Sequence, residues 1–192
     1  MRIVAGTARG QHLKGPKGDA IRPTSDRTRQ TLFDVLGQWC DGLTVLDLFA
    51  GTGALGLEAV SRGANKAVLV DQGKEALALC RENASRLRLS PKVEVLGWEA
   101  VGAIGRLSAR GDRFDLVFAD PPYALEVGQK LLSALDESAL LSPGARICLE
   151  HDKREALVEQ VGRLTRFDER KLGDTVVSLY ARNDLGLTPP VG

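Results

Sequence analysis

The stretch Val45-Leu46-Asp47-Leu48-Phe49-Ala50-Gly51-Thr52-Gly53-Ala54-Leu55-Gly56 predicts a buried strand, a tight turn and the start of a helix. The run 44–49 is apolar except for Asp47. Because a carboxylate is costly to bury, we expect Asp47 near the end of the strand, with hydrogen-bond partners. Gly51 and Gly53 permit positive φ angles, so the backbone N–H groups of the turn can come close to a ligand.

Two kinds of ligand fit this turn. Gly51-x-Gly53-x-x-Gly56 matches the dinucleotide fingerprint, in which the third glycine lets the helix pack closely on the sheet. The pattern D-x-F-A-G-x-G from Asp47 to Gly53 resembles the S-adenosylmethionine loop of class I methyltransferases. A dinucleotide places its pyrophosphate at the helix N-terminus, where the Asp47 carboxylate would repel it. The ammonium and sulfonium of S-adenosylmethionine suit that carboxylate, so the turn favours S-adenosylmethionine.

The charge of the chain is unevenly distributed. A length of 192 residues suits one domain with a full core. The net charge is +1, but residues 1–30 hold seven Lys or Arg and two Asp, giving +5 and leaving −4 for the remainder. A basic arm on a mildly acidic body indicates a polyanionic partner, with a solvated tail as the alternative.

Neither the cysteines nor the hydropathy suggests a metal, disulfides or a membrane. Cys40, Cys80 and Cys148 are odd in number and widely spaced, so we expect reduced thiols in the core and no metal site. The start of the chain is too short and polar for a signal peptide. No apolar run approaches the roughly 20 residues that span a bilayer. We therefore expect a cytoplasmic protein.

Strand-like and helix-like segments alternate along the chain, which predicts an α/β sheet. The expected strands cover 43–49, 66–71, 92–96, 114–119, 145–150, 164–170 and 174–181. The expected helices cover 26–40, 54–62, 73–88, a short segment ending near 108, 127–136 and 153–162. The last two strands form an apparent hairpin, so the sheet should be mostly parallel with one antiparallel strand. Short strands near 2–5 and 11–14 predict a small β appendage.

The helix expected at 26–40 has an apolar stripe at helical spacing. The stripe consists of Leu32, Phe33, Leu36, Trp39 and Cys40. Arg29 lies one turn before Leu32 and points near the same face. Two roles remain open for this arginine: a structural ion pair and a contact with the substrate.

Further cofactor contacts are expected at two other strand ends. Asp71 ends the strand 66–71 about 20 residues after the glycine turn, where an acidic residue holds ribose hydroxyls; the alternative is a helix cap. Glu99 stands where methyltransferases often have an Asp-Ala or Asn-Ala that contacts adenine. Trp98 is equally suited to stacking on the adenine and to packing in the protein.

The tetrapeptide Asp120-Pro121-Pro122-Tyr123 follows the strand 114–119. The two prolines fix the backbone and remove two N–H donors. The Asp120 carboxylate and the Pro121 carbonyl remain as acceptors, which suits an exocyclic amine with two hydrogens to donate. Tyr123 offers a face for stacking a base. A rigid β-turn is the structural alternative.

These acceptors suit methyl transfer from a sulfonium to the amine of a nucleobase. No strong base is needed before attack, because the nitrogen becomes acidic as it is alkylated, and Asp120 can assist the proton loss. Positioning and placed charge should supply most of the catalysis. The target base must be unpaired or flipped to enter such a pocket.

A fourth stretch narrows the class. Arg22-Pro23-Thr24-Ser25-Asp26-Arg27-Thr28-Arg29-Gln30-x-Leu32-Phe33 resembles the R-P-T-x-D-x-x-[KR]-E-x-[LIV]-F signature of bacterial 16S ribosomal RNA guanine-N2 methyltransferases, and Arg2–Gly6 with Arg9-Gly10 also fits. The resemblance implies a Rossmann-like fold and methylation of the N2 amine of one guanine on assembled or assembling small subunits. Gln30, where the family usually has Glu, and Glu99 depart from its pattern.

The motifs and the resemblance together define three sets of residues. Those expected in catalysis are Asp120, Pro121, Pro122 and Tyr123. Those expected to bind S-adenosylmethionine are Asp47, Phe49, Ala50, Gly51, Gly53, Asp71, Trp98, Glu99 and Asp120. Those expected to bind RNA are Arg2, Arg9, Arg22, Thr24, Arg27, Arg29 and Tyr123. We expect a basic appendage over 1–24, a methyltransferase domain over 25–182, a flexible tail over 183–192, and a monomer.

Three other functions compete with this interpretation. An adenine-N6 methyltransferase acting on DNA or RNA also uses D-P-P-Y, but the chain is small and has the R-P-T-x-D signature. An NAD-dependent oxidoreductase is favoured only by the glycine spacing. A non-catalytic RNA-binding module for ribosome assembly is opposed by the intact motif at Asp120.

Overall fold

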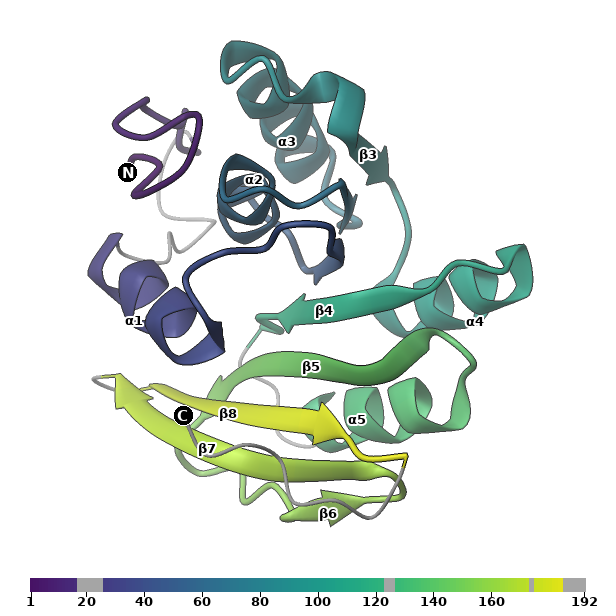
Figure 1. The fold of residues 1–192 in the computed structure, drawn as a ribbon. Helices are drawn as coiled ribbons and strands as arrows, with labels where there is room; N and C mark the ends of the chain where they lie inside the picture. Colours follow the sequence, from purple (N-terminus) through teal and green to yellow (C-terminus); the bar gives the residue numbers. More distant parts are fainter. Residues whose placement is uncertain (17–25, 123–126, 173–174, 185–192) are drawn as a thin grey trace. The chain divides into compact units, whose positions relative to one another are not determined.

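The chain divides into two compact units, which are described in turn: unit 1 is residues 1–100 and unit 2 is residues 101–192. This computed structural model describes residues 1–16, 26–122, 127–172 and 175–184 (Figure 1). Among the helices of these ranges, none combines the length and the apolar character that crossing a membrane would require.

Unit 1 contains three parallel strands in the order β3-β2-β1. They are β1 (Thr44–Leu48), β2 (Lys66–Val70) and β3 (Val93–Leu96). Leu48 lies opposite Val70, and Val70 lies opposite Leu96. This register brings the carboxyl ends of all three strands to one edge of the sheet, where ligands of open α/β sheets bind.

Two helices connect these strands: α2 (Ala54–Ser61) and α3 (Lys74–Arg86), with the short 3₁₀ helix η1 (Ser90–Lys92) after α3. All eight residues of α2 are buried. A Cβ atom on Gly56 would lie 2.3 Å from Cδ2 of Leu69 and 3.2 Å from Oδ2 of Asp47. The expectation that this glycine permits close packing of the helix on the sheet is therefore confirmed.

Helix α1 (Asp26–Leu36) is shorter than expected. Gly37 has a φ of +86°, a left-handed conformation that commonly ends helices. Leu32, Phe33 and Leu36 are buried as expected, but the side chain of Trp39 is 63% exposed. The assignment of Trp39 to the apolar stripe was wrong, because the helix ends before it.

The N-terminal segment folds back on itself. Arg2 and His12 form an isolated antiparallel bridge, so the two expected short strands are reduced to one pair of residues. Ile3, Ala8 and Leu13 are buried. Residues 1–16 are therefore packed against the rest of unit 1 rather than solvated, whereas the boundary expected at residue 24 lies outside the described residues.

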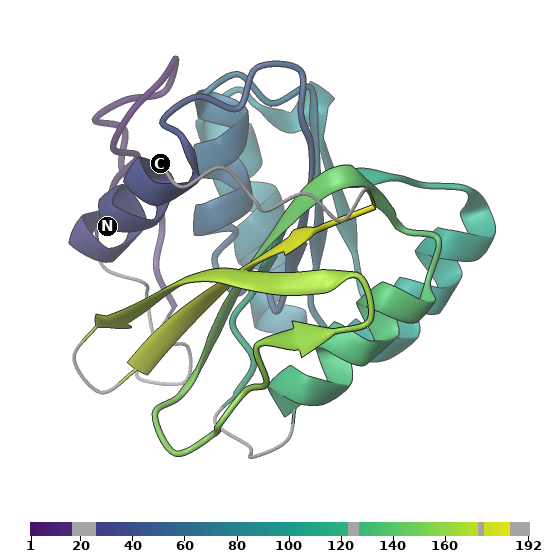
Figure 2. The ribbon, with the colours of Figure 1, turned by 60° about the horizontal axis from the view of Figure 1, so that its bottom comes forward.

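Unit 2 contains a mixed sheet in the order β4-β5-β8-β7-β6. Its strands are β4 (Phe114–Ala119), β5 (Leu141–Asp152), β6 (Gln160–Val161), β7 (Leu164–Leu172) and β8 (Thr175–Arg182), and its helices are α4 (Ala100–Arg110) and α5 (Val127–Glu137). β4 and β5 are parallel, whereas β8 pairs with both β5 and β7 in antiparallel fashion. The hairpin expected from the last two strands is confirmed. Figure 2 shows α5 beside the short strand β6.

The helix expected at 153–162 does not form, and β6 adds a second antiparallel strand to the single one expected. The backbone of this segment bonds to other elements instead. Val158 O accepts the hydroxyl of Tyr180 (2.6 Å), and Glu159 O accepts the N–H of Arg166 (2.8 Å). Only one residue of the segment's apolar pattern, Leu157, is buried. These tertiary contacts outweigh the helical periodicity.

Candidate active site

The turn after β1 has a left-handed backbone at three positions. The φ angles are +60° at Phe49, +55° at Gly51 and +78° at Gly53. The Ala50 N–H donates to Val70 O (3.0 Å), and the Gly53 N–H donates to Ala50 O (2.7 Å). Phe49 is a bulky residue in a conformation that usually favours glycine, which marks a local strain of the kind found at ligand sites.

Asp71 fastens this turn to the neighbouring strand. Its Oδ2 accepts the N–H of Gly51 (2.9 Å), and its Oδ1 accepts the N–H of Gly73 (2.8 Å). Gly73 is the N-cap of α3, so the second bond joins Asp71 to the start of that helix without capping its first turn. Each carboxylate oxygen has a second lone pair, and the residue is only half-buried. Asp71 therefore keeps acceptor capacity for further donors such as hydroxyl groups.

Asp47 lies in β1 one residue before its end, with 3% of its surface exposed. Its Oδ2 accepts the N–H of Gly56 (2.9 Å), so the expected position and partner are confirmed. Burial raises the pKa of Asp47 to about 7; the hydrogen bond from Gly56 lowers the pKa, and the nearby Asp71 raises it. The carboxyl group is thus balanced between its neutral and charged forms near neutral pH.

This pKa predicts a pH-dependent loss of stability. Between its ordinary value of 3.8 and about 7, the unfolded chain releases the Asp47 proton while the folded chain retains it. Folding stability should therefore fall as pH rises through this window, by at most about 1.4 kcal/mol per pH unit. The variant Asp47→Asn keeps an acceptor for Gly56 but does not titrate. In urea unfolding at several pH values, its stability relative to the wild type should increase from pH 4 to 7. Parallel pH profiles would contradict this prediction.

The segment after β3 completes the edge of unit 1. Gly97 and Glu99 are exposed and Trp98 is half-buried. A Cβ atom on Gly97 would lie 3.1 Å from Cδ1 of Leu77, a residue of α3 that is itself only half-buried. The structure thus brings both residues expected to contact adenine to the strand edge that holds the glycine turn and Asp71.

These groups fit the cofactor expected from the sequence. At this edge lie a strained backbone turn and the half-buried carboxylate of Asp71, with the buried carboxyl of Asp47 in the adjoining strand. S-adenosylmethionine supplies an electrophilic methyl group on a sulfonium when bound. Within the described residues, no three or more His, Cys, Asp or Glu side chains are grouped to hold a metal ion.

The motif expected in catalysis lies in unit 2. Asp120 follows β4, whose last residue, Ala119, lies opposite Leu149 of β5. Asp120 is half-buried, Pro121 is buried and Pro122 is exposed. The motif therefore sits directly at the carboxyl end of a parallel strand, as predicted. Tyr123 lies outside the described residues.

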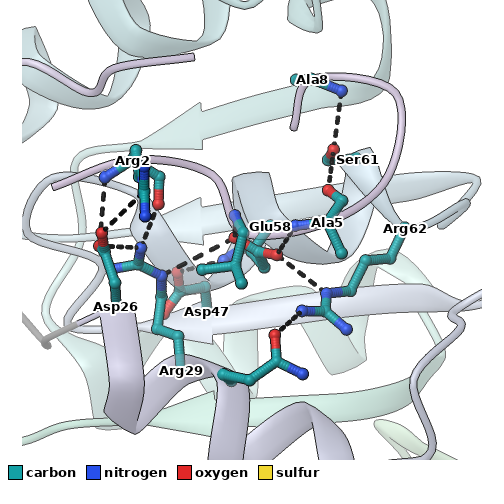
Figure 3. A network of polar contacts seen from close by, with 12 residues as sticks. Arg2, Ala5, Ala8, Asp26, Arg29, Asp47, Glu58, Ser61 and Arg62 are labelled. Carbon is teal, nitrogen blue, oxygen red and sulfur yellow. Dashed lines mark hydrogen bonds and ion pairs between the residues drawn. The ribbon is translucent and has the colours of Figure 1, made fainter. Parts of the chain in front are cut away.

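The residues expected to bind RNA differ in their exposure. Arg2, Arg9 and Arg27 are exposed, whereas Arg22 and Thr24 lie outside the described residues. Arg29 is fully buried and does not reach the surface. Its guanidinium contacts the carbonyl of Arg2 and the carboxylate of Asp26 (2.7 Å) (Figure 3). The ion-pair alternative therefore holds, and the assignment of Arg29 to RNA binding is corrected.

The sequence interpretation missed the other half of this buried cluster. Glu58 of α2 and Arg62, the C-cap residue of that helix, form an ion pair with 2.9 Å between Oε1 and Nε. Gln30 accepts a hydrogen bond from Nη2 of Arg62 (3.3 Å). The presence of Gln30, where the resembled family usually has Glu, therefore changes the partner of this arginine. Two opposite charges four residues apart, at the end of an otherwise apolar helix, were the available signal.

Two known proteins are similar to this chain along most of its length. The chain is 35% identical to "Putative rRNA methyltransferase YlbH" of Bacillus subtilis, over 95% of this chain and 99% of that protein. It is 31% identical to "Ribosomal RNA small subunit methyltransferase D" of Escherichia coli strain K12, over 97% and 92% of the two chains.

Solved structures share the fold. The yhhF protein of Escherichia coli superposes with a TM-score of 0.84 at 28% identity, covering 96% of this chain and 99% of that one. An RNA methyltransferase from Salinibacter ruber in complex with S-adenosyl-L-homocysteine has a TM-score of 0.64 at 22% identity, covering 85% and 95%.

The fold is that of the class I methyltransferases, as the sequence predicted. S-adenosylmethionine, the cofactor expected from the turn, is the methyl donor of this class. The family model described as "Conserved hypothetical protein 95" matches residues 1–181. The chain belongs to this family, which confirms the resemblance drawn from the motifs.

Proposed function

We propose that this chain transfers a methyl group from S-adenosylmethionine to the exocyclic N2 amine of a specific guanine in 16S ribosomal RNA, on assembled or assembling small subunits. The observation that carries the proposal is the match along nearly the whole chain to a protein named as a small-subunit ribosomal RNA methyltransferase. The choice of guanine N2 rests on the R-P-T-x-D signature and on the acceptors at Asp120.

In this proposal the two units have separate tasks. In unit 1, Asp71 accepts the ribose hydroxyls, while Asp47 faces the charged amino-acid part of the cofactor. The glycine turn lets the cofactor approach the backbone, and Trp98 and Glu99 border the adenine. In unit 2, the Asp120 carboxylate and the Pro121 carbonyl accept the two N–H bonds of the target amine.

Holding both N–H bonds on fixed acceptors favours a more tetrahedral nitrogen, whose lone pair can face the methyl group. The nitrogen becomes acidic as the new bond forms, so Asp120 need only receive or relay a proton afterwards. The rate enhancement then comes mainly from positioning and from a carboxylate placed near the developing positive charge. The guanine must be unpaired or extruded, and Tyr123 offers it a stacking surface.

A transfer assay with nucleoside analysis tests the proposal. Labelled S-adenosylmethionine is incubated with the protein and with unmodified small subunits, bare 16S RNA or duplex DNA. We expect label in N2-methylguanosine, with small subunits as the preferred substrate. Label in N6-methyladenosine would replace the proposal with the adenine-N6 alternative. RNA binding without any transfer would favour a non-catalytic assembly module.

The exposed arginines of the N-terminal region should make RNA binding sensitive to salt. Each phosphate contact that is neutralised contributes about −0.7 to −0.9 to the slope of log affinity against log salt concentration. Arg9 is exposed, so the variant Arg9→Glu should weaken subunit binding and make this slope shallower. Binding measured between low and physiological salt gives both quantities.

Arg113 provides a control for this substitution. It is also exposed, but it lies just before the amino end of β4, whereas Asp120 follows the carboxyl end of that strand. Arg113→Glu changes the net charge equally and should leave the salt slope near its wild-type value. Equal effects of the two variants would indicate a general effect of charge and would contradict a specific contact at Arg9.

Two further expectations belong to this proposal. We propose that the protein acts in the cytoplasm, where bacterial small subunits are assembled. We also propose that it acts as a monomer, because one chain supplies every residue assigned to the cofactor and to the target amine. Sedimentation of the purified protein would test the second expectation.

A further inference from the structure

Glu58 anchors the start of the chain from inside the protein. Its carboxylate is fully buried and accepts the N–H groups of Val4 and Ala5, each at 2.9 Å. The same carboxylate pairs with Arg62 at 2.9 Å and with Arg29 at 3.8 Å (Figure 3). Two backbone donors and two guanidinium groups therefore converge on one buried acceptor.

Ser61 fixes the next turn of the same segment. Its Oγ donates to Ala5 O (2.6 Å) and accepts the N–H of Ala8 (2.9 Å), and its carbonyl accepts the N–H of Thr7 (2.8 Å). Gly6 has a φ of +83°, and a Cβ atom there would lie 1.8 Å from Ser61 O. The approach is so close that only glycine fits at position 6.

Asn83 of α3 holds the segment at a third point. Its Oδ1 accepts the N–H of Lys14 (2.7 Å), and its Nδ2 donates to Lys14 O (3.0 Å). The same Nδ2 also donates to Thr52 O (2.9 Å), which belongs to the glycine turn. Asn83 is fully buried and thus joins the basic segment to the turn expected to bind the cofactor.

Glu58, Ser61 and Asn83 share one feature, which is a buried polar group bonded to the N-terminal segment. Each is polar, buried and hydrogen-bonded to the backbone of residues 4–14, so releasing that segment would break several hydrogen bonds of buried groups. Arg2 and Lys14 of this segment are exposed but form ion pairs, with Asp26 (3.6 Å) and Glu82 (2.7 Å), while Arg9 is exposed. The segment is therefore held by its backbone while Arg9 remains at the surface.

We propose that Glu58, Ser61 and Asn83 are positioning residues for the reaction. They hold the basic N-terminal segment in a fixed place, so the segment is already ordered when RNA binds. This inference rests on the proposed function. A segment ordered before binding loses no conformational freedom when the RNA arrives, so the effect falls on affinity for RNA and on KM. The rate of methyl transfer at saturating RNA does not depend on it.

Two glycines provide a matched pair of variants. Gly6 and Gly10 both have positive φ, +83° and +81°, but a Cβ atom on Gly10 would meet nothing within 4 Å. Gly6→Ala and Gly10→Ala therefore share the backbone strain, and only Gly6→Ala clashes with Ser61. We expect Gly6→Ala to raise KM for small subunits at least about tenfold, since it disrupts several hydrogen bonds at once. Gly10→Ala should stay near the wild-type KM, and both variants should keep the wild-type kcat.

A second pair separates the two anchoring helices. Ser61→Ala removes the two hydrogen bonds that its hydroxyl makes with Ala5 and Ala8 of the segment, so it should raise KM for RNA and leave S-adenosylhomocysteine affinity unchanged. Asn83→Ala also removes the bond to Thr52 and should weaken both RNA and cofactor binding. Limited proteolysis within residues 1–16 should be faster in both variants and in Gly6→Ala.

Several results would overturn the proposal. Equal KM values for Gly6→Ala and Gly10→Ala, or a fall in kcat at unchanged KM, would show that the docked segment does not position RNA. Unchanged cofactor affinity in Asn83→Ala would show that Asn83 does not couple the segment to the glycine turn. If the wild type methylates no RNA, the proposed function fails and this proposal fails with it. If the wild type is active and the variants have the same KM as the wild type, only the positioning role is refuted.

Discussion

Replacing Asp120 with alanine is expected to lower the rate of methyl transfer by about 10²- to 10³-fold at saturating substrate and cofactor, as does the loss of a charge-stabilising group in other enzymes. The carboxylate follows β4 directly, and the buried Pro121 fixes the backbone beside it. Without it, one of the two proposed acceptors for the target amine is missing. Single-turnover transfer to small subunits measures this effect, and RNA binding should be retained.

Asp115 offers a matched control on the same strand. It lies near the amino end of β4, whereas Asp120 follows the carboxyl end. Asp115→Ala should therefore leave the transfer rate within a few-fold of the wild type. Asp120→Asn keeps one acceptor oxygen and should fall between the wild type and Asp120→Ala. A fully active Asp120→Ala variant would rule out the proposed role of this carboxylate.

Replacing Glu58 with alanine is expected to cause the largest loss of stability, about 3–5 kcal/mol, as for other buried ion pairs that lose one partner. The substitution leaves the guanidinium groups of Arg29 and Arg62 buried without their shared carboxylate. It also removes the acceptor of the Val4 and Ala5 N–H groups. Urea or thermal unfolding measures the loss, which is a large fraction of the usual stability of a domain.

The exposed pair between Lys14 and Glu82 is the appropriate comparison. It has 2.7 Å between Nζ and Oε2, as short as many buried pairs, but both side chains are at least 40% exposed. Glu82→Ala should cost less than about 1 kcal/mol. If the two variants lost similar stability, burial would not be what makes the Glu58 cluster important. Glu58→Gln keeps an acceptor oxygen but loses the charge, so a loss as large as that of Glu58→Ala would identify the charge, rather than the hydrogen bonds, as the main contribution.

The local part of the candidate cofactor site was predictable from sequence. A strand, a glycine turn and a helix are adjacent in the chain, so residue types alone indicate the turn and the close approach at Gly56. The position of Asp47 followed from the cost of burying a carboxylate. In contrast, the bond from Gly51 to Asp71 joins residues 20 positions apart, and only the register of β1 and β2 brings them together.

The errors arose where tertiary contacts decide the outcome. The periodicity of 153–162 suits a helix, but hydrogen bonds from Arg166 and Tyr180 bind its carbonyl groups instead. Arg29 could not be assigned from its own helix, because its burial depends on Glu58, which lies 29 residues later. Trp39 was misplaced because Gly37 was not recognised as the end of α1.

The bonds within the glycine turn also have a kinetic consequence for ligand binding. The amides of Ala50, Gly51 and Gly53 are already bonded, to Val70 O, to Asp71 Oδ2 and to Ala50 O. Fixing a residue's backbone costs about 1–2 kcal/mol of conformational entropy, and here that cost is met during folding. A ligand that enters this edge of the sheet finds the turn in place, so its association should be fast and free of a slow rearrangement phase.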